Sequence, residues 1–494
     1  MPTFFTRLLL HGSILLLLPL KMNGQCDSLE VPGNEIDEDC DGFDDLFLLL
    51  PPYIYLASGE PFELFFRHTL FSDHPADYQF EVSCLLGGVT EAEKWTITPT
   101  DVQAGTHKLS LIVRTPEGKV LDSAHTTVLV SKAVPPDDPS TRKLLLFGHS
   151  FFDQGYLPYY LHQFLLQANN PTVTFHGKRQ SWIDEQLRFE AIGGANWQYY
   201  ADFTQSPMFY NGHLDLRAYF DAVIGPGQNP DWIIIHLDIN DYCTNTDIEG
   251  TSTDEVDQYI AANYAARTKP FIDSLRAVAP KTKIGIAYTP YPSASQQAFD
   301  NAYGAGSLLA NRHRWRLIVS RLLFKNTEFF ADREAENIYL LPTYLNLDDV
   351  NEFSPTDPVH PQPMSGNVAL DGPSGYRRIA RTYYAWMRYL LVGTEELIPT
   401  TTSTVTGDSE SSNFRLLPNP ATGYTLLESR TSLDGPARVA IFNSIGQLAL
   451  EKTWYPSDSN LLKLDLTGLA AGTYFVRVIK PNRSAVLKCV ITAP

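Results

Sequence analysis

Short apolar runs alternate with longer segments of helical spacing through the middle of this 494-residue chain. The runs have the length of buried strands, and the segments between them place apolar residues three and four positions apart. Strands that alternate with helices predict a parallel sheet covered by helices. The expected strands are 144–147, 173–175, 232–237, 284–288 and 338–341, and the expected helices are 157–168, 256–277, 308–324 and 376–392.

The first of these runs leads into Gly148-His149-Ser150, and the loop after the last run holds Asp357-Pro358-Val359-His360. A serine hydroxyl becomes nucleophilic when an imidazole takes its proton and a carboxylate orients that imidazole. Ser150, His360 and Asp357 are the residue types that this chemistry needs. Each motif alone is common by chance, but their places at the first and last strands of one sheet favour a shared site at its carboxyl edge.

Four segments of this region resemble the signature blocks of the SGNH (GDSL-like) hydrolase superfamily, in the family's order. They are Gly148-His149-Ser150-Phe151, Ile192-Gly193-Gly194-Ala195-Asn196, Asp238-Ile239-Asn240-Asp241 and 357–360. The resemblance covers residues 141–396. It implies a three-layer, flavodoxin-like α/β domain that hydrolyses esters without a metal or organic cofactor.

The resemblance also implies a role for each matching residue. Ser150 would be the nucleophile, His360 the general base and Asp357 the partner that orients it. The oxyanion would be held by the backbone N–H groups of Ser150 and Gly194 and by the side-chain amide of Asn240. These roles together describe an acyl-enzyme mechanism.

Two positions depart from the family pattern. His149 stands where the family usually has Asp, at a position that supports the turn. Asp238 stands where the family usually has Gly, which allows the sharp turn that aims Asn240. Asp enters left-handed backbone conformations more readily than most residues, so Asn240 can still be placed. A carboxylate pointing inward would weaken oxyanion stabilisation.

The N-terminus predicts export, because Arg7 precedes a short apolar segment that is followed by small and polar residues. We expect a secreted or cell-surface protein with no transmembrane segment in the mature chain. The net charge of -18 argues against a nucleic-acid partner. Of the five cysteines, Cys26 and Cys40 are the best local disulfide pair, and the others are expected to be buried apolar residues: Cys84, Cys243 and Cys489.

An acidic segment follows the predicted signal peptide. It places carboxylates at alternating positions before a glycine turn, as a Ca²⁺ loop requires, and resembles aspartate-rich metal-binding motifs of bacterial surface proteins. It is not an EF-hand, because Leu48 stands where the bidentate Glu would be. The alternative is a solvated acidic linker. The expected ligands of a structural Ca²⁺ are Asp37, Asp39, Asp41 and Asp45.

Two further regions read as β-structure. Residues 48–133 hold short strand-like runs separated by turn residues and predict an immunoglobulin-like sandwich, either a spacer or a carbohydrate-binding module. Residues 413–494 resemble the C-terminal sorting domain of the Bacteroidetes type IX secretion system through Gly446-Gln447, 464–469 and 472–478. That resemblance implies the secretion machinery as a partner. The alternative is an ordinary accessory sandwich.

The sequence therefore predicts a multidomain protein, with an α/β three-layer SGNH-hydrolase domain flanked by β-sandwich domains. The boundaries are 1–25 for the signal peptide, 26–46 for the acidic motif, 48–133 for the first sandwich, 141–396 for the hydrolase domain, 397–412 for a Thr/Ser-rich linker and 413–494 for the sorting domain.

The expected function is that of a secreted serine esterase. Its modular, exported form most resembles esterases that remove acetyl groups from polysaccharides or oligosaccharides. Trp197, Tyr199 and Tyr200 are candidates for a sugar platform, with core packing as the alternative. Two other functions remain open: a catalytically weak or inactive glycan-binding protein of the cell surface, and a lipid esterase.

Overall fold

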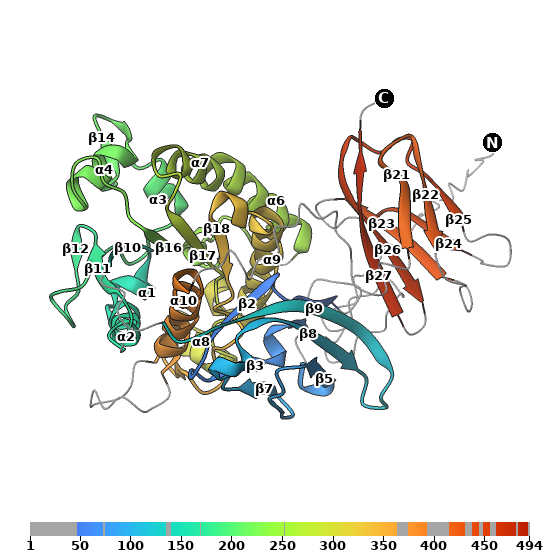
Figure 1. Ribbon diagram of the computed structural model, residues 1–494, viewed down its shortest axis with the longest axis horizontal. Helices are drawn as coiled ribbons and strands as arrows, with labels where there is room; N and C mark the ends of the chain where they lie inside the picture. Colours follow the sequence, from blue (N-terminus) through green and yellow to red (C-terminus); the bar gives the residue numbers. More distant parts are fainter. Residues whose placement is uncertain are drawn as a thin grey trace, which may run out of the picture.

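The computed structural model describes residues 47–72, 75–134, 140–167, 169–250, 252–362, 374–392, 414–429, 437–443, 448–454, 461–480 and 483–492 (Figure 1). The predicted signal peptide, the acidic motif and the Thr/Ser-rich linker lie outside these residues. The described chain contains several sheets and a set of helices, as expected of a multidomain protein.

A seven-stranded sheet forms the middle of the chain, in the order β12-β13-β10-β16-β17-β18, with β11 also paired to β10. All pairs are parallel except β12 with β13. The five expected strands are confirmed, whereas the sequence did not predict β12 and β13. The strands are β10 (Thr141–Gly148), β11 (Thr172–His176), β12 (Arg179–Gln180), β13 (Arg188–Ala191), β16 (Trp232–His236), β17 (Lys283–Ala287) and β18 (Ile338–Leu341).

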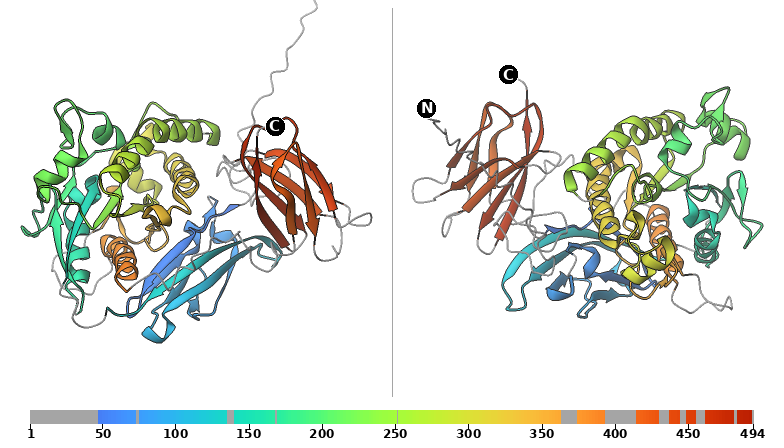
Figure 2. Two further views of the ribbon diagram at one scale, coloured as in Figure 1. Left: turned by 45° about the horizontal axis from the view of Figure 1, so that its top comes forward. Right: turned by 180° about the vertical axis from the view of Figure 1, so that it is seen from behind.

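Helices cover both faces of this sheet (Figures 1 and 2). On one face, the Phe147 ring of β10 stacks on Phe271 of α7 (Lys269–Val278), with ring centroids 5.3 Å apart. On the other face, His236 of β16 lies 2.7 Å from the Tyr383 hydroxyl of α10 (Gly375–Leu391). Successive side chains of a strand point to opposite faces, so the central strands are buried on both sides.

The expected helix 256–277 is interrupted. It consists of α6 (Thr253–Asn263), a π-helical turn (Tyr264–Thr268) and α7. Pro270 near the start of α7 has no N–H to continue the ladder of hydrogen bonds, and the wider turn absorbs that break. The other helices are α1 (Ser150–Asp153), α2 (Tyr156–Leu165), α3 (Trp197–Ala201), α4 (Leu216–Val223), α5 (Ile239–Tyr242), α8 (Gln296–Tyr303) and α9 (Arg312–Phe330).

The N-terminal β region contains two main sheets, β2-β9-β8-β5 and β3-β7-β6. Strands β3, β5, β7, β8 and β9 confirm the short strand-like runs expected in this region; the immunoglobulin-like type stays a prediction. The strands are β1 (Phe47–Leu48), β2 (Tyr53–Ala57), β3 (Phe62–Phe65), β4 (Leu70–Phe71), β5 (Gln79–Cys84), β6 (Val89–Thr90), β7 (Lys94–Ile97), β8 (Gly105–Arg114) and β9 (Val120–Ser131).

This β region packs directly on the α/β region, and the two share one hydrophobic core. The ring centroids of Tyr55 in β2 and Tyr389 in α10 lie 5.3 Å apart. Arg67 forms ion pairs with Asp348, at 2.8 Å, and with the buried Asp349. The two regions are therefore held together by both apolar and charged contacts, and the role of the β region as a spacer or a carbohydrate-binding module stays a prediction.

The C-terminal β region has its own hydrophobic core and stands apart from the other two regions (Figure 2). Its seven strands follow the order β24-β23-β26-β27-β21-β22-β25. Arg477 makes one contact with the N-terminal β region, 3.0 Å from Asp122. The strands are β21 (Phe414–Thr422), β22 (Tyr424–Ser429), β23 (Ala437–Asn443), β24 (Leu448–Trp454), β25 (Leu461–Asp465), β26 (Gly472–Lys480) and β27 (Arg483–Ile491).

Candidate active site

Ser150 lies at the carboxyl edge of the parallel sheet, as the sequence predicts. β10 ends at Gly148, and α1 begins at Ser150. A Cβ at position 148 would lie 2.4 Å from the backbone oxygen of His236, so only glycine allows the two strands to approach this closely. The first N–H groups of a helix have no partner within the helix, which leaves the Ser150 N–H free to bind an oxyanion.

His360 and Asp357 lie beside Ser150 in the short strand β20 (Asp357–Pro361). His360 Nε2 lies 2.8 Å from Ser150 Oγ, and His360 Nδ1 lies 2.8 Å from Asp357 Oδ2. Asp357 Oδ1 also accepts hydrogen bonds from the backbone N–H groups of Val359, at 3.2 Å, and His360, at 3.0 Å. The structure therefore brings the three predicted residues together in a Ser-His-Asp hydrogen-bonded series.

Asp357 is held in its ionised form. Partial burial opposes ionisation, but the hydrogen bonds and the positive charge that His360 can carry outweigh burial and lower the pKa of Asp357 below its usual value. An ionised carboxylate on Nδ1 keeps the proton there and leaves Nε2 free to accept the serine proton.

His149, one of the two departures from the family pattern, supports the turn. It is fully buried, and its Nδ1 accepts a hydrogen bond from the Phe151 N–H at 3.3 Å, which caps α1. Burial, together with repulsion from His236 and His360, holds the pKa of His149 well below its ordinary value. The ring is therefore neutral at physiological pH, as an N-cap acceptor must be.

Gly194 and Asn240 lie on two neighbouring segments that are joined by hydrogen bonds. Gly194 follows β13, has a φ of +80° and has an N–H without an acceptor among the described residues. Asn240 in α5 donates through Nδ2 to the backbone oxygen of Ala195 at 2.9 Å. The preceding Gly193 N–H donates to Asp153 Oδ2 at 2.9 Å, which ties the same loop to α1.

Asp238, the second departure, takes the backbone conformation that glycine would supply. Its φ is +81°. Its carboxylate is buried and accepts from Trp197 Nε1 at 2.7 Å and from Asn326 Nδ2 at 2.8 Å. Both oxygens are thus bonded away from Ser150 and Asn240, so the carboxylate is not the inward-pointing charge considered from the sequence.

We expect Asp238→Gly to lower the free energy of unfolding by about 2 kcal/mol. Two buried donors would lose their acceptor, at roughly 1–3 kcal/mol each, while relief of the positive φ returns about 1 kcal/mol. Asp332→Gly is the matched control, because Asp332 also has a positive φ (61°) but is exposed. Urea denaturation should show a loss for the first variant and no loss for the second; equal effects would contradict the bonding role of Asp238.

Asp241 is a second buried carboxylate that the sequence placed in a matching block without a role. It accepts from the Trp197 N–H at 3.1 Å and from Asn263 Nδ2 at 3.1 Å. Burial, reinforced by repulsion from Asp238, raises the pKa of Asp241 to about 7. Asp153 and Asp241 were missed as structural residues because their partners come from distant segments.

We expect Asp241→Asn to alter how stability depends on pH. The folded protein holds the Asp241 proton more tightly than the unfolded chain does, so stability present at low pH is lost as the pH rises toward 7. Asparagine carries no such proton. As the pH rises from about 4 to about 7, the Tm of the wild type should therefore fall relative to the Tm of the variant. A constant difference between the two Tm values would contradict the raised pKa of Asp241.

Two of the three aromatic residues after Gly194 are too buried to form the sugar platform considered from the sequence. Trp197 and Tyr200 are buried, and the Tyr200 hydroxyl donates to the Gly148 backbone oxygen at 2.8 Å. Tyr199 is only partly exposed. Core packing, the alternative interpretation, is correct for Trp197 and Tyr200, because both side chains tie this segment to the sheet.

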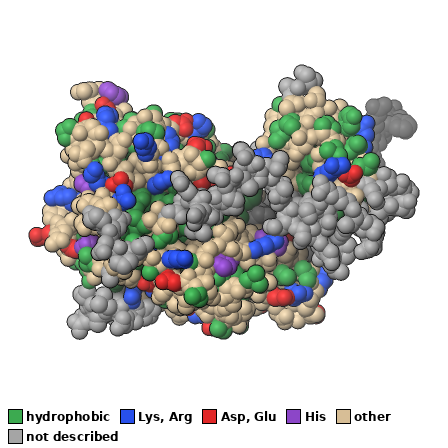
Figure 3. Space-filling view, in the orientation of Figure 1, with side chains coloured by type: hydrophobic (Ala, Val, Ile, Leu, Met, Phe, Trp, Pro, Cys, Tyr) green, Lys and Arg blue, Asp and Glu red, His purple; other side chains and the backbone are tan. Residues whose placement is uncertain are grey.

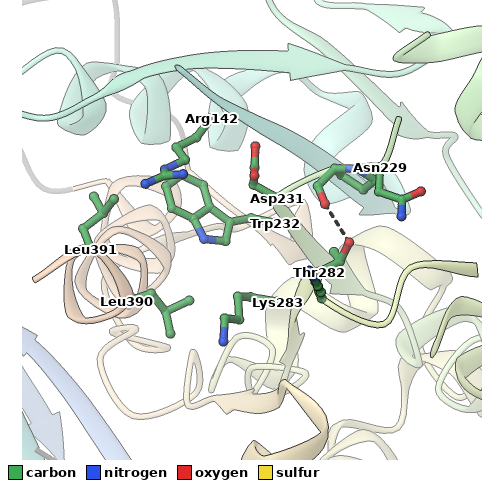
Figure 4. A pocket seen from close by; sticks show the side chains of 10 residues that line it. Arg142, Asn229, Asp231, Trp232, Thr282, Lys283, Leu390 and Leu391 are labelled. Carbon is green, nitrogen blue, oxygen red and sulfur yellow. Dashed lines mark hydrogen bonds between the residues drawn. The ribbon is translucent and has the colours of Figure 1, made fainter. Parts of the chain in front are cut away.

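A cavity of about 380 Å³ opens at the opposite, amino-terminal edge of the sheet (Figure 4). It is lined by Arg142, Trp232 and Lys283 at the starts of three strands and by Leu390 and Leu391 at the end of α10. The cavity therefore lies at the opposite ends of the strands from Ser150 and is not part of the candidate site.

Among the described residues, no cluster of three or more His, Cys, Asp or Glu side chains could hold a metal ion. The predicted calcium ligands lie outside those residues.

Two of the three cysteines that the structure describes are buried as expected, whereas Cys84 is only partly buried. Cys84, Cys243 and Cys489 form no disulfide, and Cys243 and Cys489 are fully buried. Burial raises the pKa of Cys243 to about 12, so its thiol is not ionised.

Comparison with known proteins identifies the C-terminal region. Residues 415–492 match the family described as secretion system C-terminal sorting domain. The chain therefore carries a sorting domain, which supports secretion and contact with the secretion machinery. No helix in the described parts of the chain is long and apolar enough to cross a membrane. A search of curated proteins found no match.

Solved structures resemble the chain only distantly. A Streptococcus pneumonia protein described as a platelet activating factor is 12% identical, with 51% of this chain and 86% of that chain covered and a TM-score of 0.28. A Parabacteroides merdae protein described as a GDSL-like lipase is 14% identical, with 52% and 100% covered and a TM-score of 0.28. Scores this low do not establish a shared fold.

Proposed function

We propose that this protein is a secreted serine esterase of the SGNH type that hydrolyses carboxylic esters. The observation that carries the proposal is the series of hydrogen bonds from Ser150 through His360 to Asp357, both 2.8 Å long. The strand order, with β13 and β10 followed by β16, β17 and β18, is consistent with a flavodoxin-like sheet and supports this proposal.

In the proposed reaction, Ser150 Oγ attacks the ester carbonyl carbon while His360 Nε2 takes the hydroxyl proton. Asp357 stabilises the imidazolium that forms. His360 then gives its proton to the leaving alkoxide, and an acyl group stays on Ser150. Water, deprotonated by the same nitrogen, attacks this acyl group. The bond from the acyl carbon to Ser150 Oγ then breaks, the acid is released, and His360 returns the proton to Ser150 Oγ.

The proposed oxyanion site combines the N–H groups of Ser150 and Gly194 with the Asn240 amide. One hydrogen of that amide is bonded to Ala195, which orients the group and leaves the second hydrogen for the oxyanion. Asp238 supports this arrangement because it accepts a hydrogen bond from Trp197, which lies three residues after Gly194 in the chain. Each donor of such a site contributes about 10²–10³ in rate.

We further propose acetyl esters on polysaccharides or oligosaccharides as substrates. A catalytically inactive glycan-binding protein is less well supported, because the three reactive side chains are within hydrogen-bond distance.

Acidic and basic side chains are interspersed over the face drawn in Figure 3, with no continuous basic surface among its described residues. A structural Ca²⁺ in the acidic N-terminal motif is kept as a separate proposal and has no part in catalysis.

The test is acetate release from acetylated polysaccharides and nitrophenol release from short-chain esters, with Ser150→Ala as the comparison. Activity that depends on Ser150 would support the esterase. Turnover of long acyl esters in preference to acetyl esters would support the lipid-esterase alternative. Inactivity of the wild type in every assay would contradict the proposal.

A further inference from the structure

Trp182 lies on the surface beside the helix that begins at Ser150, and it is 68% exposed. It belongs to the loop between β12 and β13, and its indole N–H donates to the backbone oxygen of Gln154 at 2.9 Å. The Gln154 N–H in turn donates to the Ser150 backbone oxygen at 2.9 Å. One helical turn therefore separates the anchor of the indole from the candidate nucleophile.

The loop that carries Trp182 is fixed in place. Gly155, with a φ of +80°, lets it approach closely, since a Cβ there would lie 3.0 Å from Ser181 Oγ and 3.2 Å from Ile183. Ser181 Oγ accepts from the Ile183 N–H at 3.2 Å, and the Ser181 N–H donates to the Leu187 oxygen at 2.9 Å. An exposed aromatic side chain on so constrained a loop loses little further entropy when it binds a ligand.

A continuous series of rings joins Trp182 to the catalytic histidine. Trp182 and Tyr156 pack edge to face, with their ring centroids 5.7 Å apart. Tyr156 stacks on Tyr376 at 5.8 Å, and Phe151 contacts Tyr376 at 6.0 Å and His360 at 5.8 Å. Phe151 and Tyr376 are buried and Tyr156 is partly buried, so Trp182 is the exposed end of this series.

An ion pair joins the start of this loop to α1. Arg179, three residues before Trp182, lies 2.6 Å from Asp153 in α1, and its side chain is 47% exposed. A sugar ring presents an apolar face of C–H groups and an edge of hydroxyls, which suit an aromatic plane with polar groups beside it. An acyl chain needs continuous apolar surface instead, and an exposed ion pair made by the same loop interrupts such a surface.

We propose that Trp182 is a platform for the saccharide that carries the ester, with Arg179 donating hydrogen bonds to its hydroxyls. This inference rests on the proposed esterase function and adds to it a place for the alcohol part of the substrate. Trp182 would determine specificity without touching the reacting carbonyl.

The test compares acetate release from an acetylated xylo-oligosaccharide with release from ethyl acetate, whose alcohol cannot stack. In Trp182→Ala, the ratio of kcat/KM for the sugar ester to that for ethyl acetate should fall about tenfold, mostly through KM, which is the size of one aromatic contact. Trp182→Phe should keep most of the ratio. Leu166→Ala, which removes another exposed apolar side chain at the far end of α2, should keep the wild-type ratio.

An unchanged ratio in Trp182→Ala would overturn the platform, as would a selective loss of activity on an octanoate ester. Binding of the same oligosaccharide to Ser150→Ala by calorimetry separates this inference from the esterase proposal. Adding Trp182→Ala to that variant should weaken Kd about tenfold. If the wild type hydrolyses no ester but this difference in Kd is found, the esterase proposal fails and the platform stands; equal Kd values would refute the platform.

Discussion

Ser150→Ala should reduce kcat for short acetyl esters by about 10⁴-fold or more. The variant lacks the oxygen that lies 2.8 Å from His360 Nε2, so no acyl-enzyme can form. The site around it should remain intact, because Ser150 begins α1 through its backbone and His149 caps that helix. Steady-state kinetics with p-nitrophenyl acetate, alongside the Tm of each protein, would measure the loss and show that the fold is kept.

The control is Ser274→Ala, which removes an exposed hydroxyl bonded to Pro270 within α7. Its kcat should equal that of the wild type. His360→Ala should be about as inactive as Ser150→Ala, and the double variant no worse, since the two residues act as a unit. Additive losses in the double variant, or substantial activity in Ser150→Ala, would mean that another group is the nucleophile.

The parallel sheet could be predicted from the sequence because its central strands are buried on both faces and are therefore continuously apolar. β13 could not, although it leads to Gly194. It contains Glu190, a polar residue that is buried because Tyr219 and the Lys178 N–H donate to its carboxylate, at 2.7 and 3.2 Å. A strand whose polar side chain is satisfied by distant partners has no signature in its own sequence.

At the candidate active site too, features set by the local sequence could be predicted, whereas features set by distant partners could not. The triad residues were predicted because the chemistry requires particular residue types next to strand ends. The direction of the Asp238 carboxylate was open, since it depends on Trp197 and Asn326, which lie 41 and 88 residues away along the chain. The exposed Trp182 was also missed, because short polar β12 gives no sign that its loop returns to the end of α1.

The contact between the N-terminal β region and the α/β region was likewise not predicted, and it gives the second large expected effect. The Arg378 guanidinium in α10 is paired with Glu63 of β3 and lies 2.6 Å from Glu352. Glu352 is 4% exposed, and burial raises its pKa to about 7 even beside this cation. Removing the arginine would leave this buried carboxyl without its closest positive partner.

We therefore expect Arg378→Ala to lower the free energy of unfolding by roughly 3 kcal/mol, the usual scale for breaking a buried ion pair from one side. Arg114→Ala removes a surface pair with Glu81 inside the β region and should cost less than about 1 kcal/mol. Urea denaturation followed by tryptophan fluorescence would compare them. Because residues 47–134 and 140–392 share a core, both should unfold in one transition in the wild type. Separate transitions, or equal effects of the two substitutions, would show that the β region is only a tethered neighbour.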